Sequence, residues 1–120
     1  MELRKTFRFD AAHRLPHLPP SHKCSRLHGH TFKVEIAVIG MCDPNMGWVL
    51  DYGEIAEAFG PVLDQLDHAY LNEIPGLENP TSEQIARFIW DRLKPRLSGL
   101  TEVAVEESPS SRCVYRGPVD

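Results

Sequence analysis

Two stretches near the start of the chain alternate between apolar and polar residues, which is the pattern of a half-buried β-strand. In residues 6–14, TFRFDAAHR, one face would carry Phe7, Phe9, Ala11 and His13. In residues 28–40, HGHTFKVEIAVIG, one face would carry His28, His30, Phe32, Val34, Ile36 and Val38. A proline-rich loop separates the two stretches, so we expect them to form an antiparallel pair of strands.

The middle of the chain has the apolar spacing of helices. After Asp51, apolar residues recur at helical spacing at Ile55, Phe59, Leu63 and Leu66. The dipeptide at 60–61, Gly-Pro, predicts a kink or a break within this helix.

A second helix is predicted to begin at Thr81, because Gln84 three residues later completes the pattern of a capping box. It would end near Pro95. Residues 102–108, EVAVEES, alternate again, and residues 113–117, CVYRG, follow a turn as a fourth strand.

The order of elements is therefore strand, strand, helix, helix, strand, strand. It predicts an α+β fold, ββααββ, in which two helices cover one face of an antiparallel four-stranded sheet. The sheet would have open edges, which favour self-association. A chain of 120 residues is expected to form a single domain over residues 1–120.

Composition and charge argue against several classes of partner. The formal net charge is −4 and no long run of Lys or Arg occurs, so neither nucleic acid nor an anionic membrane is expected as a partner. No run of about 18 apolar residues predicts a membrane span, and the N-terminus lacks a signal-peptide core. The three cysteines are too few for a disulfide framework. We therefore expect a cytoplasmic protein with reduced thiols.

The sequence CSRLHGH, residues 24–30, predicts a metal site. Residues two apart on a strand point the same way, so His28 and His30 can direct their imidazoles at one point. His13 lies on the helix-facing side of the neighbouring predicted strand. Three imidazoles are the ligands of an open catalytic zinc site, although other divalent metals remain open. The alternative is that these are core histidines with polar partners in the protein.

Cys24 has three interpretations. It could be a fourth metal ligand that closes the site, or a small buried residue without chemistry. It could also stand beside the metal as a thiolate that acts as base or nucleophile, which the neighbouring His22, Lys23 and Arg26 would favour. Spacing alone does not choose between ligand and catalyst.

Two further features involve carboxylates. Asp67 could orient the imidazole of its neighbour His68, but a helix-end charge beside a surface histidine is the simpler interpretation. Glu107 shares a strand face with apolar residues, so it either points inward toward a ligand or lies in water at a frayed strand end.

The motifs FDAAHRLP, HKCSRLHGHTF, GWVLDYGEI, LDHAYLNEIPGLENPTSEQIARFIWD and CVYRG cover essentially the whole chain. Together they resemble the 6-pyruvoyltetrahydropterin synthase / 6-carboxytetrahydropterin synthase family. The short C-x-x-x-H-G-H spacing is similar to the carboxy branch, which acts in queuosine biosynthesis. The resemblance implies a Zn²⁺ ion bound by His13, His28 and His30, with Cys24 as a catalytic base rather than a ligand.

The same resemblance implies roles for five more residues. Asp67 and His68 match the proton relay of the family, and Glu107 matches the carboxylate that anchors the pterin. Thr81 and Ser82 match a helix start that contacts the pterin in relatives. The implied fold is the tunnelling fold, in which sheets of several subunits assemble into a barrel, commonly a hexamer with sites at subunit interfaces.

The implied reaction takes 7,8-dihydroneopterin triphosphate and water to 6-carboxy-5,6,7,8-tetrahydropterin, acetaldehyde and triphosphate. Lys23, Arg14 and Arg26 are candidates for binding the triphosphate. The nearer alternative is a 6-pyruvoyl product or cleavage of sepiapterin on the same scaffold. The more distant alternative is a non-catalytic zinc-binding module closed by Cys24.

Overall fold

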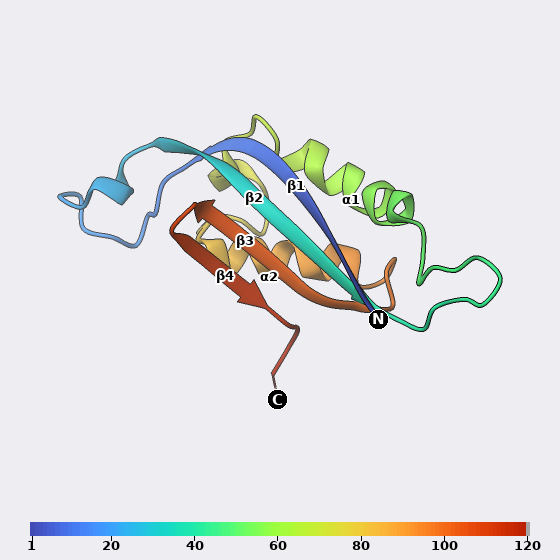
Figure 1. Ribbon diagram of the computed structural model, residues 1–120. Coiled ribbons are helices and arrows are strands. Elements are labelled where there is room, and N and C mark those ends of the chain that lie inside the picture. The colour runs from blue at the N-terminus through green and yellow to red at the C-terminus, as the bar shows by residue number, and fades with distance from the viewer. Residues whose placement is uncertain (120) are drawn as a thin grey trace.

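The computed structural model describes residues 1–119 (Figure 1). It contains four strands, two α-helices and two short 3₁₀ turns. In chain order these are β1 (Glu2–His13), η1 (Lys23–Ser25), β2 (His28–Ile39), α1 (Tyr52–Leu66), η2 (Leu71–Glu73), α2 (Ser82–Leu93), β3 (Leu100–Ser108) and β4 (Ser111–Tyr115). The predicted α+β order, ββααββ, is confirmed.

The strands form one sheet in the order β1-β2-β3-β4, and every neighbouring pair is antiparallel. β1 and β2 are the longest strands and pair over their whole length. Figure 1 shows that the loop with η1 extends from one end of this pair, while the N-terminus lies at the other end. In this register His13 lies opposite His28, and Ala11 opposite His30. The ends of β1 and β2 therefore bring the predicted ligands together.

Both helices pack on the same face of the sheet. Most of the alternating residues on the predicted inner face are buried, whereas Phe7, His28 and His30 are half-buried. The Phe9 and Phe32 rings stack across β1 and β2 with their centroids 5.0 Å apart. Phe7 meets Phe59 of α1, with ring centroids 4.6 Å apart. Burial of this apolar face supplies the main driving force for the fold. No helix among residues 1–119 has both the length and the apolar character that crossing a bilayer requires.

Of the kink or break predicted at residues 60–61, the break is wrong, because α1 continues through Gly60 and Pro61. Proline has no N–H to offer the carbonyl of Glu57, one turn earlier. Both Glu57 and Pro61 are exposed, so water can hydrogen-bond that carbonyl. The apolar side of α1 stays buried against the sheet, and this packing stabilises the helix.

The start of α2 agrees with the prediction. The Thr81 hydroxyl accepts a hydrogen bond from the Gln84 N–H at 3.2 Å. Glu83 lies in the first turn, where a negative charge complements the helix dipole. This cap fixes the position of Thr81, the residue that follows Pro80. The Pro80 carbonyl in turn contacts the ring of His13.

The face of the sheet opposite the helices carries charged side chains. Arg4 of β1 pairs with Glu35 of β2 and with Glu102 of β3, and Arg112 of β4 also pairs with Glu35. Glu102 is buried, and its hydrogen bond from Arg4 holds the pKa of this carboxyl below its usual value. These ion pairs link all four strands across a face that no helix covers.

Candidate active site

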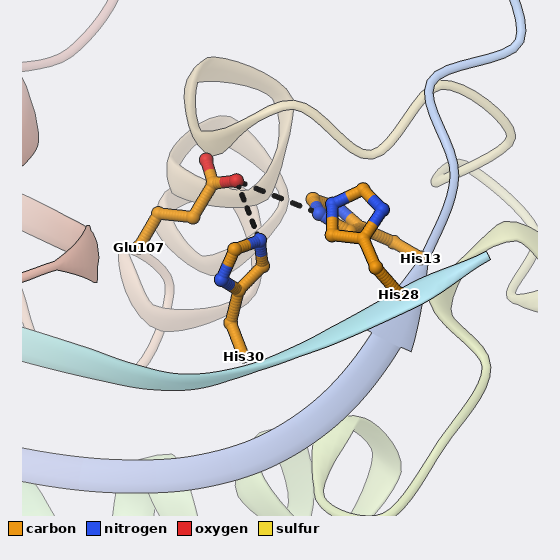
Figure 2. Close-up of side chains that lie close together, drawn as sticks. All are labelled: His13, His28, His30 and Glu107. Carbon is orange, nitrogen blue, oxygen red and sulfur yellow. Dashed lines mark ion pairs between the residues drawn. The ribbon is translucent and has the colours of Figure 1, made fainter. Parts of the chain in front are cut away.

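Three histidines converge at the end of the β1–β2 pair. Figure 2 shows His13 from β1 and His28 and His30 from β2 gathered around one point together with Glu107 of β3. The ring centroids of His13 and His28 are 4.6 Å apart, and those of His28 and His30 are 4.9 Å apart. Each of these four residues offers one ligand atom, and these atoms all lie within 4.8 Å of one another.

Backbone carbonyls orient two of the rings. Nδ1 of His13 lies 2.8 Å from the Pro80 carbonyl oxygen, and Nδ1 of His28 lies 2.7 Å from the Arg26 carbonyl oxygen. A carbonyl only accepts, so each Nδ1 carries a proton, and in the neutral form of the ring Nε2 is then the atom with the lone pair. This arrangement is typical of metal-binding histidines, whose second nitrogen is held by an outer hydrogen bond.

Two of the inner nitrogens face only the carboxylate of Glu107. Nε2 of His13 and Nε2 of His30 are buried and make no hydrogen bond. Because burial lowers the pKa of His13, this ring stays neutral near pH 7. Buried lone pairs without a donor are costly, and a divalent cation would satisfy them.

Glu107 points inward, as one of the two sequence interpretations expected. Its Oε1 lies 2.9 Å from Nε2 of His30 and 3.5 Å from Nε2 of His13 (Figure 2). A carboxylate this close to two imidazole nitrogens needs positive charge beside it, which a ring proton or a bound cation supplies. The three histidines, with Glu107 beside them, therefore fit a divalent metal ion. Both ion pairs of Glu107 use Oε1, and the residue also lines the cavity that contains Cys24.

Cys24 lies in η1, half-buried and not in a disulfide. It lines a cavity of about 440 Å³ together with Lys23, His28, His30, Glu107, Ser108 and Ser111. Cys24 is not one of the residues whose ligand atoms gather at the histidines. This geometry favours a thiol beside a metal site over a fourth ligand.

Asp67 and His68 form a hydrogen-bonded pair just after α1. Nδ1 of His68 lies 3.0 Å from Oδ1 of Asp67, and that oxygen also accepts from the Asp10 N–H at 3.0 Å. The Asp10 N–H, followed by His68, holds the pKa of Asp67 below its usual value. His68 has φ of 59°, and no other non-glycine residue in the described part of the chain has a positive φ. Strained backbone of this kind often marks a functional position, which favours the relay over a passive surface pair.

A single chain does not bring this pair next to Cys24. His68 lines a different cavity, of about 630 Å³, with Asp10, Gly29, Thr31 and Tyr70 among its other lining residues. The Thr31 hydroxyl donates to the Asp10 carboxylate there. Asp10, Thr31 and Gly29 lie on the strand face opposite to the histidines, whereas His30 lines both cavities.

Of the other predicted residues, only one lines the cavity that contains Cys24. Lys23 lines the Cys24 cavity, whereas Nε of Arg14 donates to the Ser25 carbonyl at 3.3 Å and Arg26 is exposed. Thr81 and Ser82 line neither of these two cavities within one chain. Their contact with a pterin stays a prediction.

Sequence reasoning missed two partners of the site. The Pro80 carbonyl orients His13 from a position 67 residues away, and no motif signals a backbone acceptor. The Asp10 N–H donates a hydrogen bond to the Asp67 carboxylate. The alternating pattern around Asp10 does not predict this contact.

Three converging imidazoles and a free thiol at the end of a ββααββ sheet define a class of small α+β enzymes with a metal-assisted site. The chain matches the family described as "6-pyruvoyl tetrahydropterin synthase" over residues 2–118. It belongs to this family.

Individual relatives carry different names. A Synechocystis protein named "6-carboxy-5,6,7,8-tetrahydropterin synthase" is 39% identical, over 95% of this chain and 92% of its own. A Pyrococcus furiosus protein named "Dihydroneopterin monophosphate aldolase" is 37% identical, over 76% of this chain and 73% of its own. The solved structure of Caenorhabditis elegans 6-pyruvoyl tetrahydropterin synthase superposes with a TM-score of 0.88 at 29% identity, over 98% of this chain and 96% of that one. The expected fold and the expected enzyme class, a lyase, are confirmed.

Proposed function

We propose that this protein is a zinc-dependent lyase of queuosine biosynthesis. It would convert 7,8-dihydroneopterin triphosphate and water to 6-carboxy-5,6,7,8-tetrahydropterin, acetaldehyde and triphosphate in a reducing cytoplasm. The main support is the cavity in which Cys24, Glu107 and two of the histidines meet. The Synechocystis relative, whose name states the carboxy product, supports this branch.

Zn²⁺ held by His13, His28 and His30 would act as a Lewis acid that polarises oxygens of the substrate side chain. The Cys24 thiolate would remove a proton from the adjacent carbon. Lys23, in the same cavity, would neutralise part of the triphosphate charge.

Glu107 would bind the pterin. Its carboxylate would accept two N–H bonds from the 2-amino-pyrimidinone edge of the ring, which fixes the ring and discriminates against other heterocycles. Thr81 and Ser82, at the start of α2, would also contact the pterin.

The Asp67–His68 pair would move a second proton. Asp67 holds Nδ1 of His68, so Nε2 remains free to donate or accept. Because this pair and Cys24 line different cavities of one chain, which share only His30 among their lining residues, we propose that a site combines Cys24 of one subunit with His68 of another. The open edges of β1 and β4 would pair in such an assembly, a barrel of several copies and, by family resemblance, a hexamer.

Product analysis tests the reaction. The metal-loaded protein is incubated with 7,8-dihydroneopterin triphosphate, and the products are identified by mass spectrometry with a metal-stripped sample as control. The expected products are 6-carboxy-5,6,7,8-tetrahydropterin and acetaldehyde in equal amounts. A 6-pyruvoyl product would assign the protein to the other branch. A phosphorylated glycolaldehyde, which keeps the phosphate chain of the substrate, would assign it to the aldolase reaction instead.

Subunit mixing tests the shared site. Cys24→Ala and His68→Ala are each expected to be nearly inactive, but a mixture refolded together should regain activity, because some sites then combine an intact Cys24 with an intact His68. Each variant refolded alone is the control. A mixture no more active than its parents would mean that one chain supplies both residues.

A further inference from the structure

The outer edge of β1 is partly covered by the segment that follows α1. The His68 N–H donates to the Asp10 carbonyl at 2.6 Å, and the Ala12 N–H donates to the Ala69 carbonyl at 3.0 Å. Residues 67–72 thus run along the last residues of β1 and use the hydrogen-bonding groups that an edge strand leaves free.

Asn72 completes this contact just past the end of β1. Its Oδ1 accepts from the Arg14 N–H at 2.9 Å, and its Nδ2 donates to the Arg14 carbonyl at 2.8 Å. The same Nδ2 lies 3.3 Å from the Glu78 carbonyl. One half-buried side-chain amide therefore binds both backbone groups of the residue that follows His13.

The chain then continues directly to the Cys24 loop. The Leu15 N–H donates to the Cys24 carbonyl at 2.9 Å, and the Arg14 side chain donates to the Ser25 carbonyl at 3.3 Å. Arg14 is thus the point at which the loop leaves the strand, and its direction there sets where Cys24 lies.

We propose that Asn72 is a positioning residue that fixes Cys24 relative to His13. By holding both backbone groups of Arg14, it sets the angle at which residues 14–27 leave β1. An amide is suited to this task because it presents one acceptor and one donor side by side, as the backbone of a paired strand does. The kinetic part of this inference rests on the proposed function, but the effect on the Cys24 thiol does not.

The test compares Asn72→Ala, which loses both bonds, with Asn72→Asp, which keeps the acceptor for the Arg14 N–H but loses the donor. Asn45→Ala is the matched control, because Asn45 lies in the exposed loop between β2 and α1 and its side chain makes no hydrogen bond. Three quantities are measured: metal content, the rate of Cys24 alkylation by iodoacetamide with mass-spectrometric localisation, and kcat and KM.

Asn72→Ala is expected to keep its metal and to change the Cys24 alkylation rate at least about threefold. Its kcat should fall about tenfold or more with KM within roughly twofold, because small displacements of a catalytic group lower the rate steeply. Asn72→Asp should lie between this variant and the wild type. Asn45→Ala should match the wild type in all three measurements.

A Cys24 alkylation rate within roughly twofold of wild type in Asn72→Ala overturns the inference, whatever happens to kcat. If Asn72→Ala does not fold, the same criterion applies to Asn72→Asp, judged on the soluble, metal-loaded protein. A changed alkylation rate in a chain whose wild type does not turn over the triphosphate refutes the proposed function alone. Normal turnover with an unchanged alkylation rate refutes the role of Asn72 alone.

Discussion

Cys24→Ala is expected to lower kcat by about 10³-fold while the protein keeps its metal, because a positioned general base contributes between about 10² and 10⁴. The reason lies in the geometry: Cys24 shares a cavity with His28, His30 and Glu107 but is not part of the cluster of ligand atoms. Metal content by elemental analysis and turnover of the triphosphate substrate are measured on the same sample.

Cys42→Ala is the matched control for this variant, since Cys42 is a free, exposed cysteine in the loop between β2 and α1. It should keep wild-type turnover and metal content. Loss of the metal from Cys24→Ala would instead make the sulfur a ligand and favour a closed, non-catalytic site. Wild-type kcat in Cys24→Ala would remove the thiol from the mechanism.

His28→Ala is expected to release the metal and to lower turnover at least about 10³-fold. Removing one of three imidazoles leaves too few ligands, and the several kcal/mol that a Lewis acid contributes correspond to tenfold in rate for each 1.4 kcal/mol. Because His28 is only half-buried, the fold should persist, which circular dichroism can check. Metal titration of the stripped variant measures the loss of affinity.

His17→Ala is the matched control for the ligand variant. His17 is exposed in the loop after β1 and does not belong to the histidine cluster, so metal content and turnover should be unchanged. Full metal retention by His28→Ala would show that His28 is not a ligand, and the cluster would then need another explanation.

Local patterns predicted the elements of the fold well. Alternation in 6–14 and 28–40 predicted the long pair of strands, and the Thr81 cap predicted the start of α2, because both depend on neighbours a few residues apart. The error at Gly60 and Pro61 has the opposite cause. A proline penalises the helix locally, but packing of the apolar side of α1 on the sheet outweighs that penalty.

The candidate site divides in the same way. The H-G-H spacing and the strand position of His13 predicted converging imidazoles, and the structure brings them together with Glu107. The sequence could not predict that the Pro80 carbonyl orients His13 or that Asn72 holds Arg14. It also did not indicate that His68 lines a different cavity from Cys24.

The sequence by itself determined which side chains share a face and where α2 begins, because period and capping act over a few residues. It did not determine where the strands begin: β1 begins at Glu2, four residues before the alternating stretch. Tertiary structure alone decided which nitrogen of His13 faces the cluster, on which side of the sheet the Asp67–His68 pair lies, and how the Cys24 loop leaves β1. These features depend on hydrogen bonds between segments far apart in the chain. Such bonds produce no periodic pattern in the sequence from which they could be predicted.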